Sequence, residues 1–286
     1  MTKILFFPSS LKQIKDVNDL VDGFILSVTN LSINSLFTLN IDDIEELTKK
    51  YSDKEIFVSL NKNMFNNDLK QLEDVLIKLS NFNIAGVLYY DISVLSVVKR
   101  LKLNIHLVWS QEHLTTNYLT CNFYKDRGCK YTYLSGEITL KEILEIREKT
   151  DMKLIVPIFG YLPMFASIRH IVNNYLDYFD LKNNSEIKYM VKENNKYPII
   201  DNNLGTVAYS GHILNGLDEY LELKKRKIDY VTINSFNIDD EKIKKVLSLY
   251  KDVDANNKDE YNEKLKKMFY NLDKGFLYKE TIYKVK

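Results

Sequence analysis

The stretch KLIVPIFGYLPMFASIRHIVNNY, residues 153–175, decides the fold of this chain. Leu154–Phe159 is a short apolar run, which is typical of a strand buried on both faces. Gly160 ends this run, and an apolar segment containing Pro163 follows before Arg169 and His170. Parallel α/β folds place their sites where buried strands open into such loops. We therefore expect a site here, although a core strand followed by a structural turn would give the same pattern.

Short apolar runs alternate with amphipathic segments along most of the chain. The apolar runs predict strands at Lys3–Pro8, Gly23–Val28, Glu55–Asn61, Ile84–Tyr90, Ile105–Trp109, Tyr131–Leu134, Leu154–Phe159 and Tyr230–Asn234. The amphipathic segments predict helices at Leu11–Leu20, Ile41–Tyr51, Asp68–Leu79, Ile92–Lys102, Thr116–Arg127, Leu140–Thr150, Ile213–Lys227 and Glu241–Tyr250. Eight strands separated by helices favour an α/β fold of the TIM-like (β/α) barrel type. Periodicity alone also allows an open, doubly wound sheet.

One segment after the seventh strand breaks this alternation. Ile187–Lys192, Tyr197–Ile200 and Thr206–Tyr209 are β-prone, and Asn194-Asn195 and Asn202–Gly205 separate them. Because Asn and Gly at such points are hairpin signals, we predict a small antiparallel β insert over residues 187–210. The whole chain, residues 1–286, is predicted to be one barrel-like domain, which ends in a charged extension over residues 251–286.

Composition limits the function classes that the chain can belong to. Forty basic and thirty-nine acidic side chains leave a formal charge of +1, so no global field favours nucleic acid or membrane. No apolar run approaches the roughly 20 residues that span a bilayer, and we expect a cytoplasmic protein without a membrane contact. Cys121 and Cys129 are the only cysteines, which we expect to be free thiols. The phosphate-binding patterns GxGxxG and GxxxxGK[ST] do not occur.

The central stretch resembles a motif of the collagenase-like peptidase family U32. The family motif is an apolar strand followed by His-Gly, Ala-Leu-Cys and Tyr-Ser-Gly, with a second Cys seven positions after the first. Phe159-Gly160 stands at the His-Gly, Tyr161-Leu162 at the Ala-Leu, and Ser167 at the motif Ser. The two motif cysteines fall on Pro163 and His170.

Further matches extend this resemblance over residues 55–286, and it implies a barrel-like fold. A family segment that carries Tyr/Phe-Pro, Asp and Gly-Thr is matched by Tyr197-Pro198, Asp201 and Gly205-Thr206. Near the eighth strand, Thr232–Phe236 stands where the family usually reads Lys-Ile-Glu-Gly-Arg, so a charged pair is missing here.

The resemblance also indicates candidate site residues. Ser110-Gln111 and Asn117 match a family Ser/Thr-Gln and Asn, and Glu137 matches the Glu of a Ser/Ala-Arg-Glu segment. Gln111 and Glu137 are the candidate catalytic residues. The candidate substrate-binding residues are Ser110, Asn117, Arg169, His170, Tyr197, Asp201, Gly205 and Thr206. The alternative is structural: loop caps at several positions, a helix N-terminal charge at Glu137, and turns at Asp201 and Gly205.

What the resemblance implies about cofactors conflicts with these residues. Relatives that hydroxylate tRNA wobble uridine, ribosomal RNA or a ubiquinone precursor without oxygen hold an iron–sulfur cluster on four cysteines. Such a cluster requires a cage of thiolates. With Pro163 and His170 at the motif positions, and no cysteine after Cys129, we expect no iron–sulfur cluster and no other cofactor. HExxH is absent, and no metal ligand set is predicted.

Two functional hypotheses follow from the resemblance. In the first, the chain is a cluster-free partner in tRNA wobble-uridine hydroxylation, which forms a hetero-oligomer with a cysteine-bearing relative through the apolar Tyr161–Phe165 loop. Its barrel mouth then binds tRNA or a small carboxylate donor such as prephenate. In the second, it is a collagenase-like hydrolase that uses Glu137, His113 or His170. The peptidase hypothesis rests on the family name, because no GxSxG elbow is present.

Overall fold

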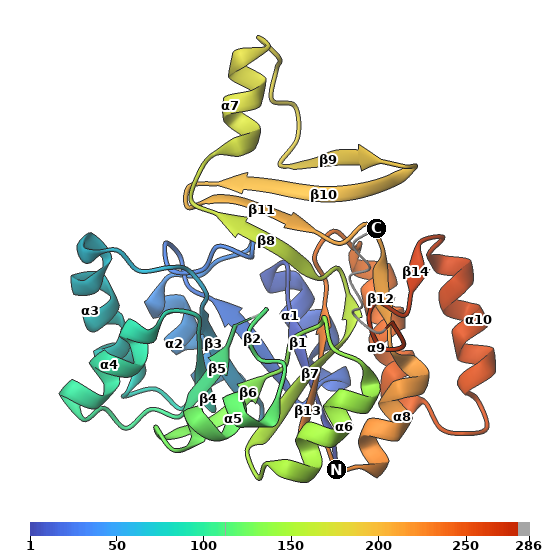
Figure 1. Ribbon diagram of the computed structural model, residues 1–286, viewed down its shortest axis with the longest axis horizontal. Helices are drawn as coiled ribbons and strands as arrows, with labels where there is room; N and C mark the ends of the chain where they lie inside the picture. Colours follow the sequence, from blue (N-terminus) through green and yellow to red (C-terminus); the bar gives the residue numbers. More distant parts are fainter. Residues whose placement is uncertain (112, 280–286) are drawn as a thin grey trace, which may run out of the picture.

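Eight parallel strands close into a barrel in the computed structural model, which describes residues 1–111 and 113–279 (Figure 1). Strand β7 pairs with β13, and β13 pairs with β1, so the ring has no open edge. The predicted TIM-like barrel is therefore confirmed. The strands of the ring are β1 (Lys3–Phe7), β2 (Gly23–Ser27), β3 (Glu55–Leu60), β4 (Gly86–Tyr89), β5 (Leu107–Ser110), β6 (Cys129–Tyr133), β7 (Lys153–Gly160) and β13 (Tyr230–Asn234).

Helices surround the barrel, and most of them bury an apolar stripe against it (Figure 1). In α3, for example, Leu72, Val75, Leu76 and Leu79 are buried. Several helices begin at a side-chain cap: the Asn40 side chain, for example, accepts hydrogen bonds from the backbone at the start of α2. The helices are α1 (Leu11–Val17), α2 (Ile41–Lys50), α3 (Leu69–Leu79), α4 (Ile92–Leu101), α5 (Tyr118–Lys125), α6 (Leu140–Lys149), α8 (Leu217–Lys225), α9 (Asp240–Asp252) and α10 (Lys258–Met268), with 3₁₀ turns at Asn18–Leu20 and Asn66–Asp68.

The barrel interior is apolar at its centre and polar at its mouth. One central layer consists of Leu5, Ile25, Phe57, Leu88, Val108, Tyr131, Ile155 and Tyr230. Side chains two residues further along a strand face the same way. On β2, β3, β5 and β13 this second layer consists of Ser27, Ser59, Ser110 and Thr232. The carboxyl ends of the strands therefore meet around hydroxyl groups.

A four-stranded antiparallel sheet stands over the barrel mouth (Figure 1). It has the order β8 (Pro163–Ser167), β11 (Gly205–Tyr209), β10 (Asn195–Asn202) and β9 (Ile187–Lys192), and helix α7 (Ile171–Tyr178) belongs to the same insert. The predicted hairpins of residues 187–210 are confirmed. The insert extends further than predicted, because Pro163–Ser167 pairs with β11 instead of forming an apolar loop, and α7 was not predicted.

The chain between β11 and α8 also differs from the prediction. The predicted helix Ile213–Lys227 begins only at Leu217, because Ile213–Asn215 forms strand β12. Leu214 and Asn215 pair with Gly160 and Phe159, so the end of β7 recruits this segment. Strand β14 (Leu272–Asp273) then adds to β12 in parallel. The C-terminal extension contains the end of α9, then α10 and β14.

The insert is fixed to the barrel by loops of the mouth. The Tyr209 ring stacks on Phe236, with 3.8 Å between ring centroids, and the Tyr209 hydroxyl donates to the Asn34 carbonyl at 2.9 Å. The Asn202 amide donates to the Ile33 carbonyl at 3.0 Å. These contacts place one face of the insert directly above the polar end of the barrel. None of the helices described in residues 1–111 and 113–279 is long and apolar enough to cross a membrane.

Candidate functional site

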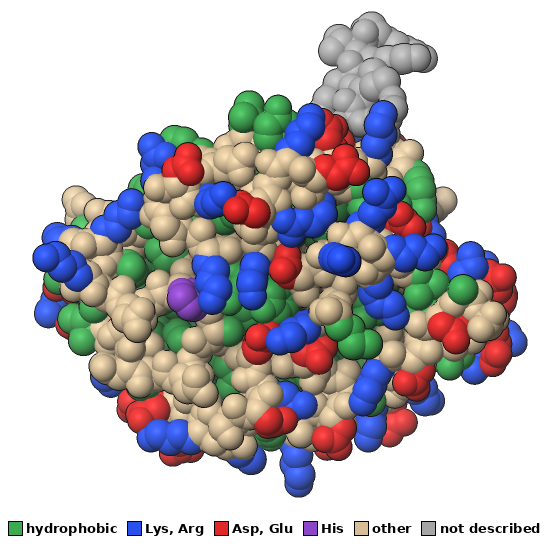
Figure 2. Space-filling model, turned by 90° about the horizontal axis from the view of Figure 1, so that it is seen from below, with side chains coloured by type: hydrophobic (Ala, Val, Ile, Leu, Met, Phe, Trp, Pro, Cys, Tyr) green, Lys and Arg blue, Asp and Glu red, His purple; other side chains and the backbone are tan. Residues whose placement is uncertain are grey.

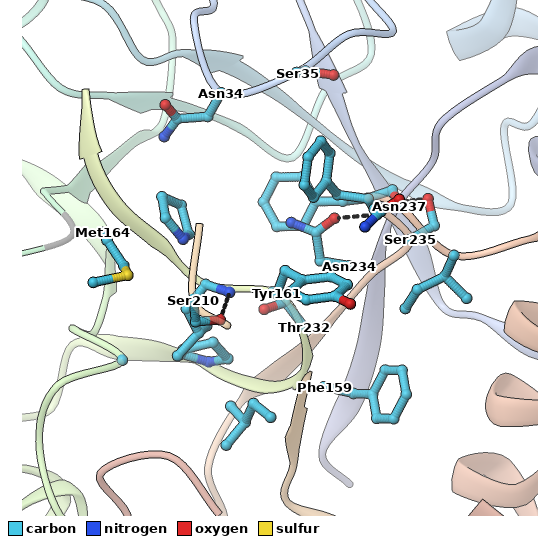
Figure 3. A pocket seen from close by; sticks show the side chains of 18 of the residues that line it. Asn34, Ser35, Phe159, Tyr161, Met164, Ser210, Thr232, Asn234, Ser235 and Asn237 are labelled. Atoms are coloured by element: carbon cyan, nitrogen blue, oxygen red, sulfur yellow. Dashed lines mark hydrogen bonds between the residues drawn. The ribbon is translucent and has the colours of Figure 1, made fainter. Parts of the chain in front are cut away.

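A cavity of about 810 Å³ lies at the barrel mouth, between the strand ends and the insert. Its floor is the hydroxyl layer of the barrel together with an amide and a phenol: Ser27, Ser59, Ser110, Tyr133, Thr232 and Asn234. Figure 3 shows Thr232, Asn234 and Ser235 of the β13 end beside Tyr161. Position and size match those of ligand sites at the carboxyl face of parallel barrels.

Hydrogen bonds hold the floor in place. The Tyr133 and Thr232 hydroxyls are 2.9 Å apart and link β6 to β13 across the barrel. The Ser235 hydroxyl donates to the Phe7 carbonyl at 2.8 Å and lies 2.7 Å from the Ser9 hydroxyl. Asn234 accepts from the Phe236 backbone N–H at 2.8 Å. Because every floor side chain is uncharged, the floor suits a neutral ligand group that both donates and accepts hydrogen bonds.

Aromatic rings form much of the cavity wall. Phe7, Tyr161, Tyr197, Phe236 and Phe276 line it. Burial raises the pKa of Tyr161, and its hydroxyl accepts a hydrogen bond from the Asn271 amide at 3.1 Å. The Tyr161 ring meets Phe236 edge to face, with 6.2 Å between ring centroids. Rigid aromatic walls around a polar floor suit a planar ring that stacks and is read along its edge.

Charged side chains occur at the cavity rim. His113 Nδ1 lies 3.3 Å from Glu137 Oε1, and both side chains are partly exposed. Glu186, Asp239 and Lys279 also line the cavity. Hydrogen bonds and ion pairs among the described residues include no side-chain contact between a Ser or Cys and a histidine. The His113–Glu137 pair has the geometry of a hydrogen-bonded acid–base pair, but among the described residues no Ser or Cys side chain forms a hydrogen bond with either of these two side chains.

The C-terminal segment after α10 completes the wall. Asp273, Gly275 and Phe276 line the cavity. Lys274 anchors them to α8, since its ammonium lies 2.9 Å from Asp218 and 2.8 Å from Glu219. This segment lies within residues 55–286, over which the sequence resembles the family, but no site residue was predicted in it.

Three predicted site residues line the cavity, namely Ser110, Glu137 and Tyr197. Gln111 is not among the lining residues, and its carbonyl accepts from the backbone of Leu114 in the following turn. Asn117 caps helix α5, accepting from the Thr120 backbone N–H at 2.9 Å. Asn117 thus has the capping role that the structural alternative gave it.

The other predicted residues meet at the start of α7, away from the cavity lining. Asp201 accepts from the backbone N–H groups of Val172 and Asn173 at 3.1 and 3.0 Å, and His170 Nδ1 lies 2.7 Å from it. Thr206 accepts from the Ile171 N–H and donates to the Arg169 carbonyl. This cluster fixes the first turn of α7 to the insert sheet.

Gly205 has a steric reason to be glycine. Its φ is +134°, and a Cβ there would lie 2.0 Å from the Ser167 carbonyl oxygen. Glycine at this position therefore allows β11 to begin directly after the turn and to pack closely against β8. The Gly205-Thr206 match to the family therefore coincides with a folding requirement of the insert.

Sequence reasoning missed Ser27, Ser59, Thr232 and Asn234. Ser27 and Asn234 end their strands, whereas Ser59 lies one residue and Thr232 two residues before a strand end. The first three follow a residue of the central layer by two positions. Because side chains two residues apart on a strand face the same side, this spacing could have identified these polar residues from the sequence. Thr232 and Asn234 had drawn notice only because they replace charged family residues.

The cysteines do not fit the iron–sulfur cage that relatives imply. Pro163 begins β8 and lines the cavity, and His170 precedes α7, so neither motif position supplies a thiolate. Cys121 and Cys129 are buried in the layer between barrel and helices. Burial raises the pKa of Cys121 to about 11 and also raises that of Cys129, which disfavours thiolate at both. No described group of three or more His, Cys, Asp or Glu is arranged to hold a metal.

The fold and the site together define a class: a closed parallel barrel with a neutral, aromatic-walled cavity at its carboxyl face and an antiparallel insert as the roof. The sequence model described as "Peptidase family U32" matches residues 12–285, and the chain belongs to this family. The resemblance found in the motifs is therefore confirmed, and it extends further towards the N-terminus.

Relatives of two kinds accompany this membership. The "tRNA hydroxylation protein P2" of Bacillus subtilis is 27% identical over 250 residues, covering 80% of this chain and 81% of that protein. The "tRNA hydroxylation protein P1" of the same organism is 29% identical over 131 residues, which are 46% of this chain and 31% of that protein. The solved structure "The Structure of the U32 Peptidase Mk0906" has a TM-score of 0.53 and 14% identity, covering 82% of this chain and 92% of that chain, and shows the same fold.

Proposed function

We propose that this protein is a cluster-free accessory subunit in oxygen-independent hydroxylation of the tRNA wobble uridine. The similarity to tRNA hydroxylation protein P2 over four-fifths of both chains carries the proposal. Proteins P1 and P2 are separate chains in one organism, which supports a division of labour between family members. The partner we propose is a relative that carries the four cysteines, in a hetero-oligomer with this chain.

The cavity chemistry supports a nucleobase as the group bound at the mouth. Uracil is planar and uncharged, and its edge carries carbonyl acceptors and an N–H donor. In this proposal, the hydroxyls of Ser110 and Thr232 and the Asn234 amide form hydrogen bonds with that edge. The rings of Tyr161 and Phe236 stack on the base. Enzymes that modify a base extrude it from its stack into a pocket of this kind.

The charge distribution favours recognition at the cavity over a basic surface. In the Lys224–Lys227 run, Arg226 is paired with Glu222 and Glu148, and Lys224 donates to the Val253 carbonyl. Lys264 and Lys266 are paired with glutamates one turn away. Figure 2, which views the end of the barrel opposite the insert, shows basic and acidic side chains interspersed. A surface that binds RNA mainly through its phosphates would need a cluster of basic side chains without acidic partners.

The experiment is deletion of the gene followed by mass spectrometry of tRNA nucleosides. We expect 5-hydroxyuridine derivatives to disappear and the wild-type gene to restore them. The double variant Tyr133→Phe/Thr232→Val removes two floor hydroxyls with little change in shape, and we expect it to restore roughly tenfold less product or none. Tyr270→Phe changes an exposed hydroxyl and serves as the matched control. An unchanged nucleoside profile in a deletion strain without another relative would contradict the proposal.

A further inference from the structure

Strand β9 forms a free edge of the insert sheet. In the strand order β8-β11-β10-β9 it has a partner on one side only. Figure 1 shows β9 as the strand farthest from the barrel, with helix α7 rising on the same side as its free edge. Exposed edges of this kind are templates for pairing with another chain unless something blocks them.

The turn at the end of β9 determines which of its backbone groups face outwards. Lys192 pairs with Asn195 across a two-residue turn, whose residues Glu193 and Asn194 have φ values of 48° and 67°. In such a turn the flanking residues exchange hydrogen bonds. Alternation then directs the backbone groups of Lys188, Met190 and Lys192 towards β10, and those of Ile187, Tyr189 and Val191 outwards.

Strand β10 is consistent with this assignment. Pro198, which lacks an N–H group, pairs with Tyr189, where the alternation places no hydrogen bond between the two strands. Among the described residues, the one recorded contact to an outward group of β9 is the Ser185 hydroxyl, which donates to the Ile187 carbonyl. That carbonyl retains a second lone pair.

The side chains of this edge are apolar and exposed. Tyr189, Met190 and Val191 are 48%, 46% and 64% exposed. Tyr175 and Tyr178 of α7 and Phe179, which follows the helix, are also exposed. No proline or bulge interrupts β9, and it pairs with β10 along its full length. A long apolar edge beside an apolar helix is a surface that association would bury.

We propose that β9 pairs with β9 of a second copy of this chain, antiparallel and centred on Tyr189. The two sheets then form one eight-stranded sheet across a twofold axis. Two β9 strands can pair only if residues whose backbone groups point away from β10 lie opposite each other. Three antiparallel registers meet this condition, in which residue 188, 189 or 190 lies opposite the same residue of the second copy. Centres at 188 and 190 place Lys188 opposite Lys188 or Lys192, and like charges opposite each other repel.

The register centred on Tyr189 is complementary in charge and in shape. It places Glu186 opposite Lys192 at both ends of the pair, and Ile187 opposite Val191. Lys188 then lies opposite Met190, so no like charges meet. This dimer is independent of the proposed function, since it requires only the insert. Its twofold axis lies between the two β9 strands, which are the strands of the insert farthest from the barrels (Figure 1).

The first experiment measures mass in solution by light scattering. We expect a dimer of about 67 kDa, twice the 33.7 kDa of one chain. Val191→Pro removes an outward N–H without touching the β10 ladder, and we expect a monomer with unchanged far-UV circular dichroism. Val191→Thr keeps the N–H and is the matched control, which should remain dimeric. Glu186→Lys should weaken the dimer roughly tenfold, and Glu186→Lys/Lys192→Glu should restore it.

The second experiment tests the register by disulfide formation, for which the native Cys121 and Cys129 are buried. Lys188→Cys/Met190→Cys places cysteines in opposed, non-hydrogen-bonded pairs with Cα atoms about 4.5 Å apart, within disulfide range. We expect cross-linked dimer under mild oxidation. Lys188→Cys alone and Met190→Cys alone should stay uncross-linked. Each single cysteine lies opposite its counterpart only in the register centred on its own position, 188 or 190. A monomeric wild-type protein at 100 µM, or a dimer unaffected by Val191→Pro, would overturn the proposal.

Discussion

Lys274 is the residue that ties the C-terminal wall of the cavity to helix α8. Its side chain is 36% exposed, but the side chain of Glu219, with which it forms an ion pair, is only 1% exposed. Lys274→Met would leave that carboxylate buried without its cation. We expect a loss of about 2–3 kcal/mol in the free energy of unfolding, less than for a fully buried pair because water reaches Lys274. Urea denaturation of the purified protein measures this change.

The matched control for that substitution is Lys279→Met in the same segment. Lys279 forms an ion pair with Asp273 at 3.1 Å, and its side chain is largely exposed. Exposed pairs contribute little, so we expect a loss below about 0.5 kcal/mol. Equal losses for the two variants would show that the buried Glu219 carboxylate does not depend on Lys274.

Single residues also show how far sequence could predict the site. Ser110, Glu137 and Tyr197 were predicted and line the cavity. Asp201 and Thr206 were predicted from the same family segment as Tyr197, yet they hydrogen-bond to the start of α7. A motif marks residues that a family needs, and it does not distinguish residues that hold an element from residues that contact a ligand. That distinction required the contacts themselves.

At the scale of elements, α7 depends on Asp201 of the neighbouring strand. The Asp201 side chain is 4% exposed, and its carboxylate accepts from two N–H groups of the first helical turn and contacts His170 Nδ1. The helix has no buried residue of its own. We therefore expect Asp201→Ala to unfold α7 locally, and to raise hydrogen exchange over residues 171–178 by about 10- to 100-fold.

The barrel should be unaffected by that change, because α7 contributes nothing to its core. Exchange in β1 and β13 is the internal reference for this expectation. Asp177→Ala, at an exposed position on α7 itself, is the control and should leave the exchange of residues 171–178 nearly unchanged. A global loss of protection in Asp201→Ala would instead mean that the insert and the barrel unfold as one unit.

Elements were predictable where the chain alternates regularly. The bounds of β13 and β9 agree with the predictions, because apolar runs and turn residues mark both. Strands β8 and β12 and helix α7 were missed. Pro163–Ser167 and Ile213–Asn215 become strands only because β11 and the end of β7 offer them partners distant in sequence. Local patterns carry no record of such partners.

At the scale of the whole molecule, eight strand–helix units predicted closure of the barrel, and closure placed the strand ends around one mouth. The shape of the site required more than this count. Its roof is an insert, its far wall is the segment after α10, and both meet the barrel through tertiary contacts such as Tyr209 on Phe236. The cavity is therefore assembled from three parts of the chain that no single motif connects.

The chain as a whole is expected to hold no iron–sulfur cluster, which is the last prediction. A cluster needs four thiolates in one cage, whereas Cys121 and Cys129 are the only cysteines and burial raises the pKa of both. Protein purified anaerobically should be colourless, with far less than one equivalent of iron and of acid-labile sulfide per chain. A family member with the four motif cysteines, purified in parallel, is the positive control for the procedure. About four irons per chain and a broad visible absorbance band would mean that this chain binds the cluster through other donors, and the proposed division between a cluster-bearing and a cluster-free subunit would then fail.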